Sequence, residues 1–547
     1  MADTKKKPNF LAQGGILAIA GIISRIIGML YRIPLMNIIG ESGSGVYSAA
    51  YDIYNIMLLI SSYSLPMAVS KLVSARLSLK QYKNVKQVLC IGLLFGAALG
   101  LAAALLMFFG AGFLADNVMN TPRAVLAVKI LAPTVFIMGM LGVLRGFFQG
   151  HGTMIPTAVS QILEQIVHVA VSILAAKILF NKAAALELSA ENMTPEAYGA
   201  AGATLGTGIG ALAALLFVGF CFFLYRKILE KRCRRDLSRS TENSLSTLKV
   251  IFFTALPILA SAAIANIETL IDHAVFGAYM GEAQDLYESV WGAYSGKYIV
   301  LINVPIAIST ALAASTLPVI SSRMAVGEKE EAMEKAAAAI RFILLIALPA
   351  SVGLTVLGKP ILNLLFRSGN NDVAGTLMIV GSFGVLGFCM AYVCVGILQG
   401  GGYLWDAILN YLIALAIHVP LLLLCLFVFK MDIYGVAVCN MIYGICSCLL
   451  HLRSLRKRFG YRQEIHDSVL MVLAASLIMG AAAFGLYKVF SALHFGNTLS
   501  LLIAIFAALI VYFAAIFLLG AVGEAELKEM PKGAALAKLA RKLRLLR

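Results

Sequence analysis

Hydrophobic and polar residues alternate along this chain in long blocks. Apolar stretches of about 20 residues, the length of a bilayer-spanning helix, recur about fourteen times, and polar residues gather in the short segments between them. Each stretch is expected to be a helix because hydrocarbon offers the backbone no hydrogen-bonding partner. A β-barrel would instead show alternating segments of about ten residues. The predicted spans lie near residues 10–38, 47–75, 86–114, 124–148, 154–180, 199–225, 248–278, 291–321, 333–357, 373–399, 404–429, 433–452, 467–492 and 497–521.

The chain also repeats itself. Gln149, Gly150, Gly152 and His168 return 250 residues later as Gln399, Gly400, Gly402 and His418. Because an even number of spans separates the copies, both cross the membrane in the same direction, which gives a parallel repeat about an axis normal to the bilayer. We therefore predict an all-α integral membrane protein with two six-helix lobes and two extra helices. The predicted parts are an N-lobe at 1–226, a basic cytoplasmic linker at 227–247, a C-lobe at 248–453, the two extra helices at 454–522 and a basic amphipathic tail at 523–547.

Composition and charge support this prediction and orient it. Of 547 residues, 60% are hydrophobic and 13% are charged, against about 25% charged in a soluble domain. With both termini placed in the cytoplasm, 31 of the 44 Lys and Arg fall on the inner side and eight on the outer side, which is the positive-inside bias. The net charge of +16 is then a signal of orientation, and nucleic acid is not an expected partner.

The sequence gives no motif that predicts a nucleotide-binding or catalytic domain. The loops are short, the phosphate-binding pattern G-x-x-x-x-G-K-[ST] is absent, and the nine cysteines form no C-x-x-C pair. Free thiols are therefore expected in place of a metal site or disulfides. The alternative of a membrane-embedded glycan polymerase or acyltransferase would need converging acid, base or nucleophilic groups, usually on a sizeable loop. We predict a transporter without a cofactor, driven by an ion gradient or by the gradient of its substrate.

Four of the basic residues within predicted spans are candidates for substrate binding. Arg25 and Arg32 are two turns apart on one helix face, and each costs about 2.5–3.5 kcal/mol at a helix centre. A diphosphate could offset that cost, since the guanidinium fork binds phosphate oxygens in pairs. Lys297 would add a cation from the second lobe, and Arg145, within the repeated motif, is a further candidate for substrate binding or gating. The alternatives are pairing with carboxylates or snorkelling to the interface.

Acidic and amide side chains form two pairs in the second half of the chain. Glu268 and Asp272 are four residues apart, as are Asp406 and Asn410, so each pair presents oxygens on one helix face. Hard oxygen ligands are what a sodium site or a proton relay requires. The pairs are therefore predicted to couple transport to a cation; the alternative is that they form salt bridges with Lys297 or the arginines of the first lobe.

A family resemblance rests on these residues. Ser24-Arg25-Ile26-Ile27-Gly28 with Arg32, the segment Leu-Arg-Gly-Phe-Phe-Gln-Gly at 144–150 and the lobe pattern resemble the multidrug/oligosaccharidyl-lipid/polysaccharide exporter superfamily. Within it the chain is most similar to the polysaccharide-transport branch, the stage V sporulation protein B-like and MurJ-like lipid II flippases. MurJ-like proteins space the two arginines six apart instead of seven, and carry an acidic and then a basic residue where this chain has Val46-Tyr47 and Asp52.

The resemblance implies a function in the cell membrane. It implies translocation of an undecaprenyl-diphosphate-linked sugar or muropeptide, such as lipid II, from the inner to the outer leaflet by alternating access, in a protein that acts as a monomer. The substrate would be a peptidoglycan precursor, a teichoic acid unit or a capsule repeat. A drug antiporter on the same fold is the alternative, and the basic residues argue against it because they favour an anionic substrate.

Overall fold

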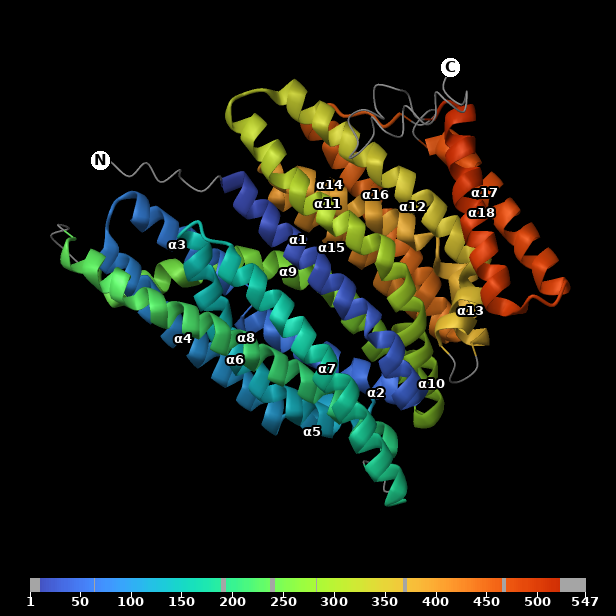
Figure 1. The fold of residues 1–547 in the computed structure, drawn as a ribbon, viewed down its shortest axis with the longest axis horizontal. Helices are drawn as coiled ribbons and strands as arrows, with labels where there is room; N and C mark the ends of the chain where they lie inside the picture. Colours follow the sequence, from blue (N-terminus) through green and yellow to red (C-terminus); the bar gives the residue numbers. More distant parts are fainter. Residues whose placement is uncertain are drawn as a thin grey trace. The chain divides into compact units, whose positions relative to one another are not determined.

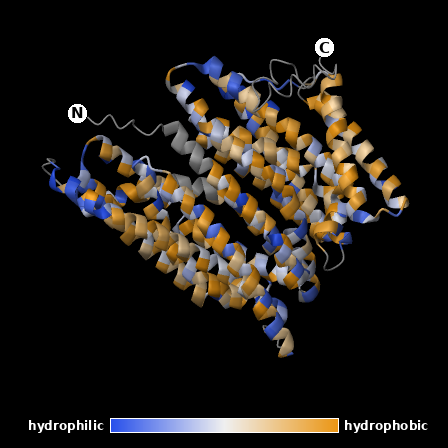
Figure 2. Cartoon of the chain, viewed as in Figure 1, coloured by the Kyte–Doolittle hydropathy of each residue, from blue (hydrophilic) through white to orange (hydrophobic). Residues whose placement is uncertain are grey.

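Helices carry almost all of the chain in the computed structural model, which describes residues 10–62, 64–187, 193–236, 242–281, 283–366, 371–464 and 469–521. These residues contain no β-strand, so the predicted all-α class is confirmed. Figure 2 shows hydrophobic residues along most of the helices and hydrophilic residues gathered near their ends. Among the described residues eleven segments are long and apolar enough to cross a membrane, or twelve with the bent pair α13 (Asp372–Gly381) and α14 (Gly384–Gly400), whose axes differ by 54°.

The first of these segments accounts for part of the difference from the fourteen predicted spans. Ile19–Ser78 is 60 residues long, which at 1.5 Å per residue is about three times the roughly 30 Å hydrocarbon thickness. It is interrupted at Tyr31, at Gly40 and again after Ser62. It is therefore long enough for both of the first two predicted spans, and the exact count of crossings stays approximate.

The chain divides into two compact units, Met1–Gly296 and Lys297–Arg547. Within the first, α7 packs along α8, and α6 packs against both α4 and α8 (Figure 1). The helices of this unit are α1 (Phe10–Leu30), α2 (Arg32–Ser61), α3 (Leu65–Ser78), α4 (Tyr82–Phe109), α5 (Ala111–Phe113), α6 (Val125–Gly150), α7 (Ile155–Ala185), α8 (Pro195–Arg234), α9 (Ser244–Met280) and α10 (Gln284–Ala293), with the short turns η1 (Leu114–Val118) and η2 (Pro122–Ala124).

The second unit is built around α14, which packs against α11, α12 and α16, while α17 pairs with α18 (Figure 1). The boundary between the two units falls within the π-helical turn η3 (Tyr294–Tyr298), so the second unit begins inside this turn. Its remaining helices are α11 (Ile299–Ala325), α12 (Lys329–Leu365), α15 (Leu404–Leu423), η4 (Leu424–Val428), α16 (Asp432–Phe459), α17 (Met471–Ala492) and α18 (Gly496–Leu518).

Close contact between α2 and α10 depends on glycine. A Cβ on Gly292 of α10 would overlap the backbone oxygen of Glu41, and one on Gly45 of α2 would overlap the backbone oxygen of Glu288. The helix α2 also bends where Gly40 adopts φ 72° and ψ −173°, a conformation that strains a residue with a Cβ. The sequence of α2 thus allows it to bend and to hold α10 at backbone distance.

The repeated motif forms the same turn in both units. Helix α6 ends at Gly150 and α14 ends at Gly400, and two residues later Gly152 and Gly402 adopt φ of 74° and 85°. Only glycine enters this region without strain, which explains its recurrence at an offset of 250 residues. Both segments are tight turns between consecutive helices, α6 to α7 and α14 to α15.

The compact units and the predicted lobes divide the chain at different places. The lobes follow the sequence repeat, whereas α9 packs against α2, α3 and α4, and α10 packs against α2. The lobe boundaries remain a prediction. Part of the linker at 227–247 is not a loop, because α8 continues as a helix to Arg234. The tail at 523–547 lies outside the described residues.

Candidate functional site

Arg32 is the membrane-embedded arginine whose surroundings are best defined. It is the first residue of α2, and its Nη1 lies 3.5 Å from the backbone oxygen of Ser295. The centre of its guanidinium group lies 5.9 Å from the centroid of the Tyr47 ring. Both partners are neutral, and within the part of the chain that the structure describes Arg32 forms no salt bridge. The carboxylate of Asp52 interacts with Arg32 electrostatically but forms no salt bridge with it, so the arginine can still bind an anion.

A row of tyrosines surrounds this arginine. Tyr47, Tyr51 and Tyr54 lie on one face of α2, with ring centroids 5.1 Å and 5.4 Å apart. The hydroxyl of Tyr31 forms a hydrogen bond with that of Tyr47. The ring of Tyr31 also lies 4.8 Å from that of His168, so the repeated histidine packs against an aromatic ring. The spacing of four and three residues between the tyrosines was the sequence signal that could have revealed this row.

The contact between α2 and α10 is polar as well as close. Ser48 donates a hydrogen bond to Ser295 over 2.8 Å, and Ser42 donates one to Glu288 over 2.9 Å. Arg123, from η2, forms a salt bridge with the buried Glu288 over 3.0 Å. These bonds fix the turn that presents the Ser295 carbonyl to Arg32, so α10 positions one side of the arginine site.

Asp52 and His273 form a buried pair that the sequence did not reveal. The Nδ1 atom of His273, on α9, lies 2.6 Å from Oδ2 of Asp52. The imidazole is fully buried and stacks on Trp291 of α10 with ring centroids 4.1 Å apart. The residues are 221 positions apart, so no local spacing could have paired them. The pair joins α2 to α9 inside the first unit.

The other predicted basic residues lie in three different settings. Arg145 is buried and forms a salt bridge with Glu164 over 2.8 Å and a hydrogen bond with Ser160 over 2.9 Å. Lys297 is fully buried in the second unit and donates to Oδ1 of Asn371 over 2.7 Å. Arg25 lies on α1 with an exposed side chain. Only Arg145 therefore has its charge offset by a carboxylate whose contact the structure defines, which matches the structural alternative for that residue.

The two predicted cation-binding pairs belong to different compact units. Glu268 and Asp272 are both buried on α9, with 4% and 1% of their surface exposed. Asp406, on α15, is held instead by two bonds to Arg458 of α16, at 2.6 Å and 2.9 Å. Asn410 exchanges hydrogen bonds with Ser454, which also lies on α16. The second pair thus ties α15 to α16, while the first keeps both carboxylates in the interior of the first unit.

Comparison with known proteins identifies the family of this chain. Residues 10–324, more than half of the sequence, match the model of a family described as polysaccharide biosynthesis protein. Stage V sporulation protein B of Bacillus subtilis (strain 168) is 26% identical over 454 residues, covering 82% of this chain and 84% of that protein. Lipid II flippase MurJ of the same organism is 24% identical over 488 residues, covering 85% of this chain and 86% of that protein.

Solved structures show the same fold. Lipid II flippase MurJ in an inward closed conformation superposes with a TM-score of 0.64 at 17% identity, covering 91% of this chain and 97% of that one. An inward-facing multidrug resistance MATE family transporter of the MOP superfamily also gives a TM-score of 0.64, at 14% identity, covering 81% of this chain and 98% of that one. The resemblance drawn from the sequence is therefore confirmed: the architecture is that of MOP superfamily transporters.

Proposed function

The chain belongs to the polysaccharide biosynthesis protein family, and from this we propose that it is a flippase for an undecaprenyl-diphosphate-linked saccharide. The cargo we favour is lipid II or a polysaccharide repeat unit, moved from the inner to the outer leaflet by alternating access. The relatives named stage V sporulation protein B and lipid II flippase MurJ support this assignment. We place both termini in the cytoplasm, following the distribution of Lys and Arg, and expect a monomer to suffice.

The observation that carries the proposal is the setting of Arg32. Its contacts are a carbonyl oxygen and an aromatic ring, so its charge is available to a diphosphate, which guanidinium binds through paired hydrogen bonds. Arg25 lies two turns earlier in the sequence on an exposed face and would contact the same headgroup. Lys297, at the start of the second unit, is the third proposed contact, and Arg145 would act through the turn that follows it.

Complementation tests this function directly. The gene should restore growth to cells that have lost a lipid II flippase, with labelled precursor appearing on the outer surface. Arg25→Ala should abolish this rescue at normal protein abundance, whereas Arg25→Lys should retain part of it, because lysine keeps the charge and loses the fork. Normal rescue by Arg25→Ala at normal abundance would remove Arg25 from the site.

Energy coupling is a second part of the proposal. Glu268 and Asp272 are buried carboxylates one turn apart, and one cation moving inward gains about 2.3 kcal/mol per 100 mV. We propose that sodium or a proton binds there. Asp406 and Asn410 remain the second predicted pair, and within the second unit they bond to Arg458 and Ser454.

A cation-coupled multidrug antiporter is the competing function. The tyrosine row of α2 favours it, since aromatic faces attract organic cations, and a MATE family transporter shares the fold. Against it, the cation already lying near the Tyr47 ring is Arg32, which would repel a cationic drug. Transport of a fluorescent organic cation that depends on the tyrosines, and persists without any lipid-linked saccharide, would favour the antiporter.

A further inference from the structure

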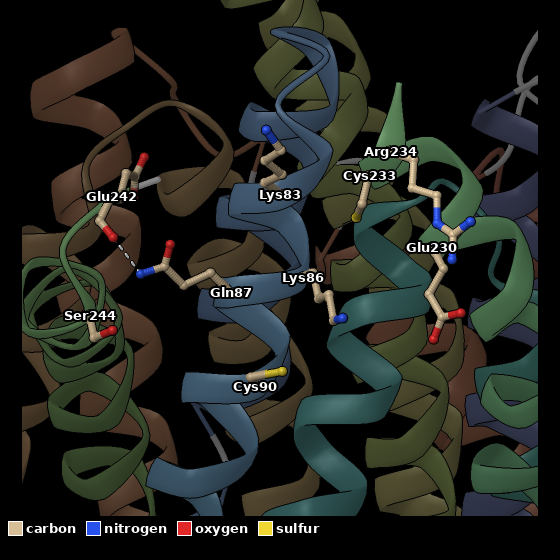
Figure 3. A pocket seen from close by; sticks show the side chains of 9 residues that line it. All are labelled: Lys83, Lys86, Gln87, Cys90, Glu230, Cys233, Arg234, Glu242 and Ser244. Carbon is tan, nitrogen blue, oxygen red and sulfur yellow. Dashed lines mark hydrogen bonds between the residues drawn. The ribbon is translucent and has the colours of Figure 1, made fainter. Parts of the chain in front are cut away.

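A cavity of about 810 Å³ opens between α4, α8 and the residues that lead into α9, all within the first compact unit. Figure 3 shows its side chains along α4, on the end of α8 and at the start of α9. The lining residues are Lys83, Lys86, Gln87, Cys90, Glu230, Cys233, Arg234, Glu242 and Ser244. None of them belongs to the arginine site on α2, so this cavity is a separate feature of the molecule.

The charge of this cavity is positive. Lys83, Lys86 and Arg234 are exposed and have no salt bridge to any residue that the structure describes. Of its two acidic side chains, Glu242 is already bound by Arg76, over 2.8 Å. Glu230 and the carboxylate of Asp236, which accepts a bond from the backbone N–H of Lys83, are left to oppose the three cations. The cavity keeps a net positive charge and is a place where an anion would be held.

The walls of the cavity are fixed by hydrogen bonds. The backbone N–H of Glu242 donates to Asn84, and its backbone oxygen accepts a bond of 2.5 Å from Gln87 (Figure 3). On the other side, the backbone N–H of Lys83 donates to Asp236 over 2.7 Å. These bonds join the start of α4 to the end of α8 and to the approach to α9. The cations therefore project from a preformed frame, which lowers the entropy lost on binding.

The cavity lies where the lipid-facing surface of these helices ends. Leu94, one turn beyond Cys90 on α4, is 72% exposed, and on α8 Leu224 and Ile228 are 61% and 50% exposed. These apolar side chains directly precede or follow the basic lining along the same helices. An occupant with a phosphate among the cations and acyl chains along Leu94 and Leu224 fits both surfaces. Basic pockets between membrane helices hold anionic headgroups in this way.

We propose that this cavity is a binding site for the phosphate headgroup of an anionic membrane lipid, in the leaflet predicted to be cytoplasmic. Lys83, Lys86 and Arg234 hold the phosphate, and the exposed apolar residues of α4 and α8 hold the acyl chains. The site does not depend on the flippase proposal, because its residues are separate from Arg32 and its ligand is a bulk lipid. Under this proposal the basic end of α8 binds lipid as well as orienting the helix in the membrane.

The free thiols of Cys90 and Cys233 line the cavity and provide the readout. The full-length protein is placed in nanodiscs of phosphatidylcholine alone or mixed with phosphatidylglycerol, and maleimide labelling of each cysteine is followed by mass spectrometry. Phosphatidylglycerol is expected to slow labelling of both thiols. K83Q/K86Q/R234Q should abolish this protection, since each basic residue contributes about fivefold to affinity and three contribute on the order of a hundredfold.

A matched control and a second source of phosphate complete the test. K227Q/K231Q/R235Q removes the same charge from exposed positions of the same helix end outside the cavity, and should keep the protection. Inorganic diphosphate is added to the phosphatidylcholine nanodiscs: protection by phosphatidylglycerol alone supports a lipid ligand, and protection by diphosphate as well supports a phosphate site that also accepts soluble anions. Protection by diphosphate alone would overturn the lipid assignment. Equal labelling in every condition, or equal protection in the cavity variant and the wild type, would overturn the site.

Discussion

Replacing Arg32 by alanine separates transport from folding. In the folded protein this arginine loses only a long contact to the Ser295 carbonyl, at 3.5 Å, and a position near the Tyr47 ring at 5.9 Å. A cation–π contact contributes about 0.5–1 kcal/mol at partly exposed sites. No carboxylate with a described contact is left unpaired by the change. We therefore expect the free energy of unfolding to fall by about 1 kcal/mol or less.

The expected effect on transport is much larger. A hydrogen bond to a charged group contributes about 1.5–3 kcal/mol, so losing the contact to the diphosphate should slow translocation about 10- to 150-fold. Arg32→Lys should lie between alanine and the wild type, because the charge remains and the paired geometry does not.

Arg145→Ala is the matched control. It removes the partner of Glu164, whose side chain is only 18% exposed, and breaking such a buried pair costs about 3–5 kcal/mol. We expect this variant to lose folded protein, measured by the temperature at which the detergent-solubilised protein aggregates, while Arg32→Ala keeps it. A wild-type rate of flipping in Arg32→Ala, or a large loss of its thermal stability, would refute the reasoning.

Three further substitutions test other parts of the structure. Asp272→Asn should make the flipping rate insensitive to the gradient of the coupling ion in vesicles while precursor still binds, and a retained dependence on that gradient would exclude this carboxylate. Asp406→Asn breaks a partly exposed ion pair and should lower the free energy of unfolding by about 0.2–1 kcal/mol, measured in urea; a loss of several kcal/mol would show that the pair is not a surface one. Gly292→Ala forces a methyl group onto the backbone oxygen of Glu41 and should cost at least about 1–3 kcal/mol, whereas Gly219→Ala, with open space around it, should be tolerated in the same thermal assay.

The features that could be predicted from the sequence depend on residues that lie close together along the chain. Blocks of about 20 apolar residues predict helices because a helix satisfies its own backbone hydrogen bonds inside hydrocarbon. The turns at Gly152 and Gly402 were predictable because both copies of the repeat keep glycine, the residue that adopts a positive φ without strain. Arg32 stood out because a charge within an apolar block is costly. Each of these inferences depends on a few neighbouring residues and one physical rule.

The features that the sequence concealed depend on distant residues. Asp406 looked like a cation ligand, yet its carboxylate faces Arg458, 52 positions later. His273 gave no signal because its carboxylate partner comes from α2. The basic residues of α4 and α8 could be interpreted only as orientation signals until the fold enclosed a cavity between them. Which of these side chains meet depends on which helices pack together. The hydropathy pattern predicts the helices but not their neighbours.

The central claim is translocation of a diphosphate-linked lipid, and vesicles test it most directly. Purified full-length protein is reconstituted with a fluorescent undecaprenyl-diphosphate-linked saccharide or with a matched polyprenyl saccharide that lacks the diphosphate, and the fraction exposed outside is followed over time. The account predicts rapid appearance of the diphosphate lipid, little transport of the uncharged one, and a loss of the difference in Arg32→Ala. Equal rates for both lipids, or rates equal to those of protein-free vesicles, would contradict it.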